Sequence, residues 1–162
     1  MFQSAGKWGR FPPAVRGRDR PAPLRGRGGA DEPTDQEVAA FYGKLLQILK
    51  DTDAFRNGDW SQIDPLPAWP SNFSSEGFVS YAWAGKDEAR YIAVINYADN
   101  QGQCYLPLPF PELEEKQLLL TELVGSEVYH RDGSDLVVRG LYIDQAPWQI
   151  NVFELRSIRA AA

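Results

Sequence analysis

The sequence Phe78-Val-Ser-Tyr-Ala-Trp-Ala84, Gly85-Lys-Asp-Glu88 and Tyr91-Ile-Ala-Val-Ile-Asn-Tyr97 indicates the fold class most clearly. Both apolar runs are rich in aromatic and β-branched residues, which favour strands. The polar residues and the glycine between them suit a tight reversal. Because a parallel crossover needs about a dozen residues or more, this short connection predicts two antiparallel strands.

The same strand pattern continues after Trp60 and is interrupted at close intervals by turn sequences such as Asp99-Asn-Gln-Gly102 and Asp132-Gly-Ser-Asp135. The expected strands are 60–66, 78–84, 91–97, 103–108, 117–124, 127–131, 136–139, 141–144 and 148–155. The prolines at 107, 109 and 111 suit a sheet edge or corner. The pattern predicts a mainly β protein, an antiparallel, Greek-key-like β-sandwich over residues 57–157, followed by a tail at 158–162.

An amphipathic α-helix is expected ahead of the sandwich, in the segment 31–56. Thr34 and Glu37 can form a capping box, and the helix should run to about Lys50, with one more turn at 54–55. Its apolar stripe comprises Val38, Phe41, Leu45, Ile48 and Leu49, widened by Tyr42 and Leu46. Because a surface helix needs a narrower stripe, we expect this face to pack against a partner.

Residues 1–30 differ in composition from the rest of the chain. They hold seven basic residues against one acidic residue, and ten of the thirty are glycine or proline. Without any helical or strand period, this composition predicts a disordered basic arm. Its short Arg-Gly-Arg sequences could bind nucleic acid, but the remaining residues are strongly acidic and would oppose a polyanion. We therefore expect a leftover tail and no nucleic-acid partner.

The length and composition of the chain limit the number of domains and the class of protein. A chain of 162 residues, 43% of them hydrophobic, suits one domain with one core. Its apolar runs are far shorter than the ~20 residues that cross a bilayer, so we expect no membrane span. The one cysteine, Cys104, cannot form an intrachain disulfide and should be a small buried residue, and the first residues lack a secretory pattern. These features predict a cytoplasmic protein.

No catalytic residue, metal site or cofactor is predicted. One cysteine and one histidine, His130, are too few for structural zinc, and we expect His130 in a solvated turn. The acidic groups at 51–53 and 112–115 are expected to be a solvated linker and turn, since a glycosidase pair is held by rigid elements across a cleft. The glycines form no phosphate-binding loop.

Trp69 is the one residue for which we predict carbohydrate binding. It lies in Leu66-Pro-Ala-Trp-Pro70, where the flanking prolines can hold its ring clear of the core for stacking on a sugar. Trp60, Trp83 and Trp148 follow strand patterns instead. We expect these three to be core or half-buried residues.

Two quoted sequences and the strand order carry a family resemblance. Ala39-Ala-Phe-Tyr-Gly-Lys-Leu-Leu-Gln-Ile-Leu-Lys50 followed by Ala54-Phe-Arg-Asn-Gly-Asp-Trp60 resembles the last helix of the (β/α)₈ barrel in the α-amylase family of glycoside hydrolases, with the turn that leaves it. The strands at 78–83, at 90–97, ending in Asn-Tyr, and at 149–155 resemble that family's C-terminal sandwich. The resemblance spans about 31–156.

The resemblance implies a function without catalysis. The family uses two aspartates and a glutamate at the ends of barrel strands that precede this helix, so none of them maps onto this chain. We expect a fragment: a non-catalytic C-terminal module of an enzyme that acts on α-glucans, stabilising a (β/α)₈ barrel. The helix face formed by Phe41, Tyr42, Leu45, Ile48 and Leu49 would contact that barrel, or a second copy of the chain.

Two alternatives stay open from the sequence. One is a free-standing module that binds starch or maltooligosaccharides through exposed aromatic residues such as Trp69. The other is an enzyme with an unrecognised site.

Overall fold

A computed structural model describes residues 35–86 and 88–158. The predicted arm at 1–30, the cap residue Thr34 and the tail beyond residue 158 lie outside the described residues. The chain divides into two compact units, Met1–Ile48 and Leu49–Ala162. No helix in the described part is long and apolar enough to span a membrane.

The predicted amphipathic helix is present as α1 (Gln36–Asp51). Its first turn is capped by Asp35, whose Oδ1 accepts hydrogen bonds from the backbone amides of Glu37 at 3.0 Å and Val38 at 3.2 Å. This side chain satisfies two of the amides that a helix start leaves unpaired. The helix end predicted at Lys50 differs by one residue from the observed end.

The predicted extra turn forms α2 (Ala54–Asn57). Arg56 donates from Nη1 to the carbonyl oxygens of Leu49 and Lys50, both at 2.6 Å, and so satisfies acceptors that the last turn of α1 leaves unpaired. Gly58 follows, and a Cβ atom there would lie 2.5 Å from Ala54 O and 2.7 Å from Ala84 O. The Arg-x-Gly sequence therefore has a structural role. Its arginine binds the last carbonyls of α1, and its glycine lets the backbone pass close to Ala84 of the large sheet.

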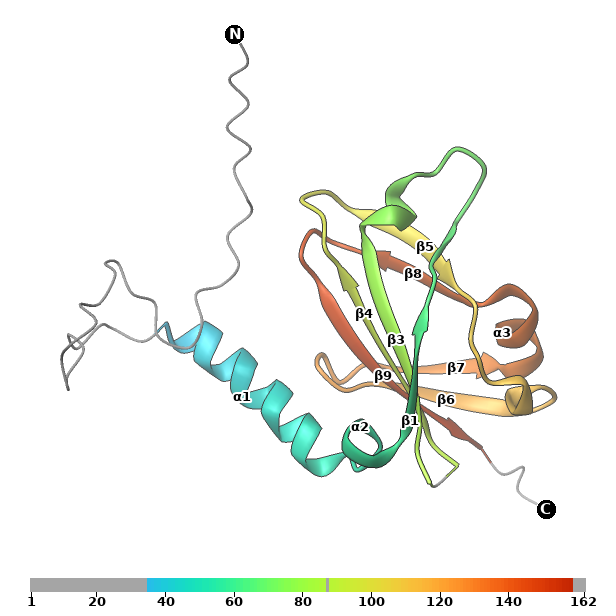
Figure 1. The fold of residues 1–162 in the computed structure, drawn as a ribbon, viewed down its shortest axis with the longest axis horizontal. Coiled ribbons are helices and arrows are strands. Elements are labelled where there is room, and N and C mark those ends of the chain that lie inside the picture. Colours follow the sequence, from blue (N-terminus) through green and yellow to red (C-terminus); the bar gives the residue numbers. More distant parts are fainter. Residues whose placement is uncertain (1–34, 87, 159–162) are drawn as a thin grey trace, which may run out of the picture. The chain divides into compact units, whose positions relative to one another are not determined.

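The predicted antiparallel β-sandwich is confirmed, with two sheets stacked as layers (Figure 1). The six-stranded sheet has the order β1 (Asp59–Ile63), β3 (Phe78–Ala84), β4 (Arg90–Asn96), β9 (Ile150–Ser157), β6 (Gln117–Glu122), β7 (Val128–Asp132). The three-stranded sheet has the order β2 (Leu66–Pro67), β5 (Gly102–Leu106), β8 (Leu141–Gln145). Short 3₁₀ turns, η1 (Ser74–Gly77) and η2 (Pro111–Leu113), join strands of different sheets.

The core lies between the two sheets and is built from alternate residues of each strand. Ile92, Val94, Leu118 and Leu155 of the large sheet and Leu106 of the small one are completely buried. Cys104 is buried with them, as predicted, and burial raises the pKa of its thiol to about 12. The cysteine is therefore a packing residue and stays protonated at neutral pH.

One predicted strand is wrong because Pro65 interrupts it. Residues 60–66 were expected to form a single strand, but β1 ends at Ile63 in the large sheet and β2 begins at Leu66 in the small sheet. Proline cannot donate to a strand ladder, so the pairing of β1 with β3 stops before it. The break lets the chain pass from one sheet to the other.

The strand predicted at 136–139 is wrong, since these residues belong to helix α3 (Gly133–Arg139). The sequence Asp132-Gly-Ser-Asp135, expected to be a tight turn, starts this helix: the Asp132 side chain accepts from the Asp135 amide at 3.1 Å. Gly140 ends it by donating to Leu136 O at 3.0 Å. Caps at both ends outweigh the strand preference of the valines between them. In the fold, α3 connects β7 to β8 (Figure 1).

Candidate functional site

The predicted partner face of α1 retains solvent exposure throughout. Phe41, Tyr42, Leu45 and Ile48 are partly buried, and no residue of the helix is fully buried. Leu49 is 47% exposed. The rings of Phe41 and Tyr42 meet edge to face with centroids 5.9 Å apart. Each of these five apolar side chains therefore keeps part of its surface exposed to solvent.

Trp69 lies in the loop between β2 and η1 and is 51% exposed. Its carbonyl accepts from the amide of Asn72 at 3.1 Å, which tightens the loop behind the ring. Phe73, in the same loop, is 74% exposed. An accessible indole fits the predicted sugar-stacking role, which stays a prediction.

The expectation for the other tryptophans is wrong in part. Trp83 is partly buried as expected, but Trp60 is 66% and Trp148 is 43% exposed. Trp60 belongs to β1, an edge strand, and its side chain lies on the sheet face that is turned away from the core. Trp148 precedes β9 and is not part of the strand. Burial of a strand residue depends on which face it occupies, and the sequence period does not say which face is covered.

The outward face of β1, β3 and β4 carries a continuous apolar surface, which we call the aromatic face. It comprises Trp60, Val79, Tyr81, Trp83 and Ile95, which the strand register places on one side of the large sheet. The Trp60 and Tyr81 ring centroids are 5.9 Å apart, and those of Tyr81 and Trp83 are 6.1 Å apart. The aromatic face suits contact with another protein surface, since aromatic residues are enriched in interfaces.

Helix α2 packs at one end of the aromatic face. The ring of Phe55 lies 5.0 Å from that of Trp83 and 5.3 Å from that of Tyr91, measured between centroids. Ala54, Ala89 and Tyr91 form a small second core beneath it. Arg56 of α2 also binds the carbonyls of Leu49 and Lys50, so α2 links these two residues to the large sheet.

Glu122 is a buried carboxylate that the sequence did not single out. It is 2% exposed, and its Oε1 accepts from the amides of Val124 and Val152, both at 3.1 Å, while Oε2 accepts from Gly125. Three backbone donors around one carboxylate stabilise the turn between β6 and β7. These bonds give Glu122 a structural role.

Asn96, the asparagine of the Asn-Tyr sequence, is also structural. It is completely buried, and its Nδ2 donates to the carbonyls of Asn100 at 2.8 Å, Ala146 at 3.0 Å and Gln145 at 3.2 Å. The side chain thus ties the turn after β4 to the turn after β8. A hydrophobic residue here would leave these carbonyls unsatisfied.

The structure places the other groups that we weighed for catalysis at exposed positions, two of them in ion pairs. His130 lies in β7, not in a turn, but it is exposed as expected. Glu112 pairs with Arg90 at 2.7 Å. Burial by itself would raise the pKa of Glu112, but hydrogen bonds from its own amide and from Arg90 outweigh burial and lower this pKa. Asp53 pairs with Arg56 at 3.5 Å. Within residues 35–86 and 88–158, no three His, Cys, Asp or Glu side chains are grouped so that they could hold a metal ion.

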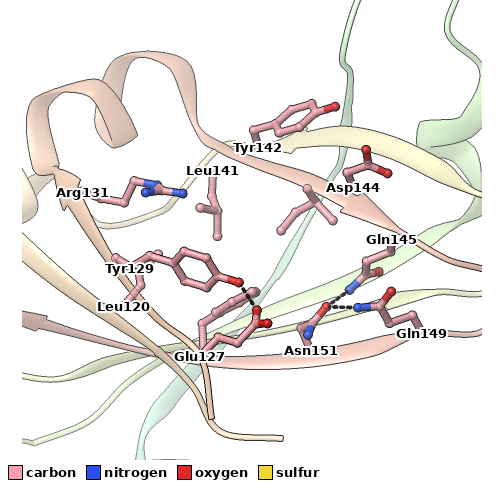
Figure 2. A pocket seen from close by; sticks show the side chains of 12 residues that line it. Leu120, Glu127, Tyr129, Arg131, Leu141, Tyr142, Asp144, Gln145, Gln149 and Asn151 are labelled. Carbon is pink, nitrogen blue, oxygen red and sulfur yellow. Dashed lines mark hydrogen bonds between the residues drawn. The ribbon is translucent and has the colours of Figure 1, made fainter. Parts of the chain in front are cut away.

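A cavity of about 350 Å³ opens where β7 and β9 of the large sheet face β8 of the small one (Figure 2). Its floor is apolar and its rim is polar. The floor is formed by Leu120, Leu141, Ile143 and Phe153. The rim is formed by Glu127, Tyr129, Arg131, Tyr142, Asp144, Gln145, Gln149 and Asn151. A concave apolar surface with several convergent polar groups is typical of a small-ligand site.

The polar rim has two parts. On one side, Asn151 Oδ1 accepts from Gln145 Nε2 at 2.7 Å and from Gln149 Nε2 at 3.1 Å (Figure 2). On the other, the Tyr129 hydroxyl donates to Glu127 Oε2, and this hydrogen bond, with burial and the Glu127 charge, raises the pKa of Tyr129. The phenol therefore stays protonated at neutral pH.

Comparisons with known proteins support the fold. No protein-family model matches the chain, and no curated protein matches its sequence. The maltogenic α-amylase AmyB from Thermotoga neapolitana has a similar structure, with a TM-score of 0.53 and 16% identity over 75% of this chain and 26% of that chain.

Two further solved structures are similar at lower scores. A trehalose-6-phosphate hydrolase from Bacillus licheniformis has a TM-score of 0.47 and 14% identity, over 75% of this chain and 20% of its own. A β-L-arabinopyranosidase from Geobacillus stearothermophilus has a TM-score of 0.47 and 14% identity, over 69% of this chain and 23% of its own. This chain spans between a fifth and about a quarter of the length of these three enzymes.

Proposed function

We propose that this chain is the C-terminal, non-catalytic β-sandwich of an α-amylase-type glycosidase acting on α-glucans, and that it stabilises the enzyme's (β/α)₈ barrel. The similarity of its fold to part of a maltogenic α-amylase supports the proposal. So does the sequence resemblance of α1 and its Arg-x-Gly turn to the last barrel helix. The proposed role is stabilisation: contact between the domain and the barrel would bury apolar surface that each of them exposes when it is alone.

The observation that carries the proposal is the aromatic face. In the domain by itself, Trp60 is 66% and Val79 is 37% exposed on a sheet that has a complete core on its other side. Covering ~200 Å² of such apolar surface contributes roughly 5 kcal/mol, which is comparable to the stability of a small domain. An apolar protein surface is the partner that suits this exposed sheet face.

Helix α1 supplies the second contact with the barrel. Its apolar stripe is wider than one neighbour needs, and Arg56 together with Gly58 connects its end closely to β1. In an intact enzyme, α1 would complete the barrel while α2 packs on the large sheet. Without a barrel, the same stripe would favour association with a second copy of the chain.

The experiment begins with the genome that encodes this chain. An adjoining reading frame with barrel strands and the family's two aspartates and glutamate supplies the partner for co-expression. We expect the two products to co-purify, and the chain to raise the barrel's melting temperature. The double variant Trp60→Ser, Tyr81→Ser should abolish both effects, whereas the control Val138→Ser, at an exposed position of α3, should change neither. Absence of such a frame, or equal binding by the double variant, would overturn the proposal.

Trp69 supports a second candidate function, a free-standing α-glucan-binding module. Its ring is 51% exposed in a short loop that also carries the exposed Phe73. Affinity electrophoresis in gels that contain soluble starch tests this function. Retardation that is lost in Trp69→Ala but kept in the control Trp148→Ala would support it, and unretarded migration of the unmodified chain would exclude it.

A further inference from the structure

We propose that the cavity between β7 and β8 binds one neutral sugar ring, such as the end unit of an oligosaccharide. This inference goes beyond the proposed stabilisation of the barrel, which does not need the cavity. It concerns strands that carry neither Trp69 nor the aromatic face. It rests on the hydrogen-bonding pattern of the rim, on the charge balance and on the size of the cavity.

The amide cluster on one side of the rim offers an oriented donor. Two Nε2 groups, from Gln145 and Gln149, point at Asn151 Oδ1, so the other end of that side chain is its Nδ2 donor group. No acceptor for this Nδ2 occurs among the described residues. Figure 2 shows the Asn151 side chain at the cavity wall, with both glutamines hydrogen-bonded to it from one side. The donor is therefore preorganised for a ligand hydroxyl.

The same cluster contains an unsatisfied acceptor. Gln145 is 1% exposed, and its Oε1 is the one buried side-chain polar atom without a hydrogen-bond partner in the described part of the chain. Its amide nitrogen is fixed by Asn151, so the oxygen cannot exchange places with it without losing that bond. A buried acceptor without a donor is rare in folded proteins, and it marks this end of the amide cluster as incompletely satisfied by the described residues.

The opposite side of the rim adds one acceptor and one donor. Glu127 Oε2 accepts a hydrogen bond from the Tyr129 hydroxyl, so Glu127 Oε1 can accept from a ligand. Arg131 lies over the Tyr129 ring, 5.3 Å from its centroid, and uses Nη1 for the carbonyl of His130. Its remaining N–H groups can donate to a ligand oxygen. Acceptors and donors therefore alternate around the rim.

This alternation favours a polyol over an ion. Each sugar hydroxyl both donates and accepts, so a mixed rim can satisfy several hydroxyls at once. Two carboxylates, Glu127 and Asp144, against one guanidinium make the rim net negative, which disfavours phosphate and other anions. The apolar floor formed by Leu141, Ile143 and Phe153 matches the C–H face of a pyranose.

The size of the cavity sets the length of the ligand. About 350 Å³ is near the lower end of the ~300–1,000 Å³ that ligand pockets span. We therefore expect one ring to be held, with any further units of an oligosaccharide in solvent. Glucose and maltose should consequently bind with similar affinity.

The experiment titrates the full chain with glucose, galactose and maltose, and follows backbone amide signals by NMR. We expect saturable shifts confined to residues 127–131 and 141–153. Asn151→Asp replaces the Nδ2 donor by an acceptor, so binding should weaken about tenfold or more. Both glutamine hydrogen bonds to Oδ1 can persist in this variant, so the cluster itself should stay intact. The matched control is Asn100→Asp, which makes the same change in an exposed turn and should leave the affinity unchanged.

The outcomes separate this site from the others. Glu127→Gln, at an exposed position, gives a second readout if Asn151→Asp proves unstable, and it should also weaken binding. Absence of saturable shifts with all three sugars would overturn the proposal. Binding that survives Asn151→Asp and Glu127→Gln but is lost in Trp69→Ala would overturn it as well. Failure of the barrel to bind would affect the proposed function alone, since that test uses Trp60 and Tyr81.

Discussion

The aromatic face lies on the large sheet and the cavity lies between the two sheets, and they are opposite kinds of surface. The aromatic face takes its rings from neighbouring strands, β1 and β3, and lies on one side of a sheet. The cavity takes polar groups from β7, β8 and the segment around β9, and is concave. The difference indicates that the first suits a protein partner and the second a small polar ligand. Four substitutions test this contrast.

The largest effect is expected for Gly133→Ala, at the start of the helix that joins the two walls of the cavity. A Cβ atom there would lie 1.8 Å from Leu113 O, a backbone atom that cannot move aside cheaply. We expect a loss of about 3 kcal/mol or more in the free energy of unfolding, measured by urea denaturation with circular dichroism. Gly43→Ala in α1 is the control, because nothing lies within 4 Å of the added atom. Equal stability of Gly133→Ala and the unmodified chain would refute the close approach of Gly133 to Leu113 O.

Glu122→Gln should have the second largest effect. The amide can still accept, but its NH₂ group must face backbone donors that the carboxylate now binds. We expect a loss of about 2 kcal/mol in urea denaturation, together with increased hydrogen exchange in the turn before β7. That turn positions Glu127 on the rim of the cavity. The variant should therefore disturb the structure of the cavity rim and leave the structure of the aromatic face unchanged. An unchanged exchange rate there would contradict the role given to Glu122.

A smaller, pH-dependent effect is expected for Glu154→Gln, at the polar border of the aromatic face. Burial by itself would raise the pKa of Glu154, but hydrogen bonds from Arg156 at 2.9 Å and Tyr91 at 2.8 Å outweigh it and lower the pKa. A lowered pKa in the folded state stabilises the protein above the unfolded pKa, and this stabilisation is lost as the pH falls through the folded pKa.

The measurement compares both proteins in urea from pH 7 to pH 3. The unmodified chain should exceed Glu154→Gln by about 0.5–1 kcal/mol at pH 7, and the gap should close below about pH 4. The exposed Glu114→Gln is the control and should show no gap. A gap that widens in acid would mean that the hydrogen bonds do not favour the charged carboxylate.

The smallest effect is expected for Trp60→Ser in the chain by itself. The ring is 66% exposed, so its removal should change the free energy of unfolding by less than about 0.5 kcal/mol. Leu120→Ala, on the inward face of the same sheet, should cost about 2–5 kcal/mol in the same denaturation experiment. A large loss for Trp60→Ser would mean that the aromatic face contributes to the fold of the domain and is less free to serve a partner.

The contrast also explains what the sequence could predict. The hairpin of β3 and β4 follows from alternating apolar residues and a short polar turn, and its register brings Phe78 opposite Asn96. The sandwich follows from repeating that pattern. Periodicity identifies strands well because each residue's side is fixed by its neighbours.

Other features depended on interactions that periodicity does not contain. Helix α3 includes Val137 and Val138 and resembles a strand, but its caps at Asp132 and Gly140 determine the outcome. The cavity assembles Glu127, Asp144 and Asn151 from three separate segments, so no local motif marks it. The exposure of Trp60 was missed because the sequence reveals two faces of a strand without showing which one another layer covers.

The position of β9 has a consequence for synthesis. This strand lies between β4 and β6 and pairs with both, so Arg90 meets Leu155, and Leu120 meets the same residue from the other side. Until the ribosome has released residues 150–157, the large sheet exists as two halves with open inner edges. Such long-range pairing folds slowly and exposes edges that can join other nascent chains. A premature stop before residue 150 should therefore leave the inner edges of β4 and β6 unpaired and cause aggregation instead of a shortened domain.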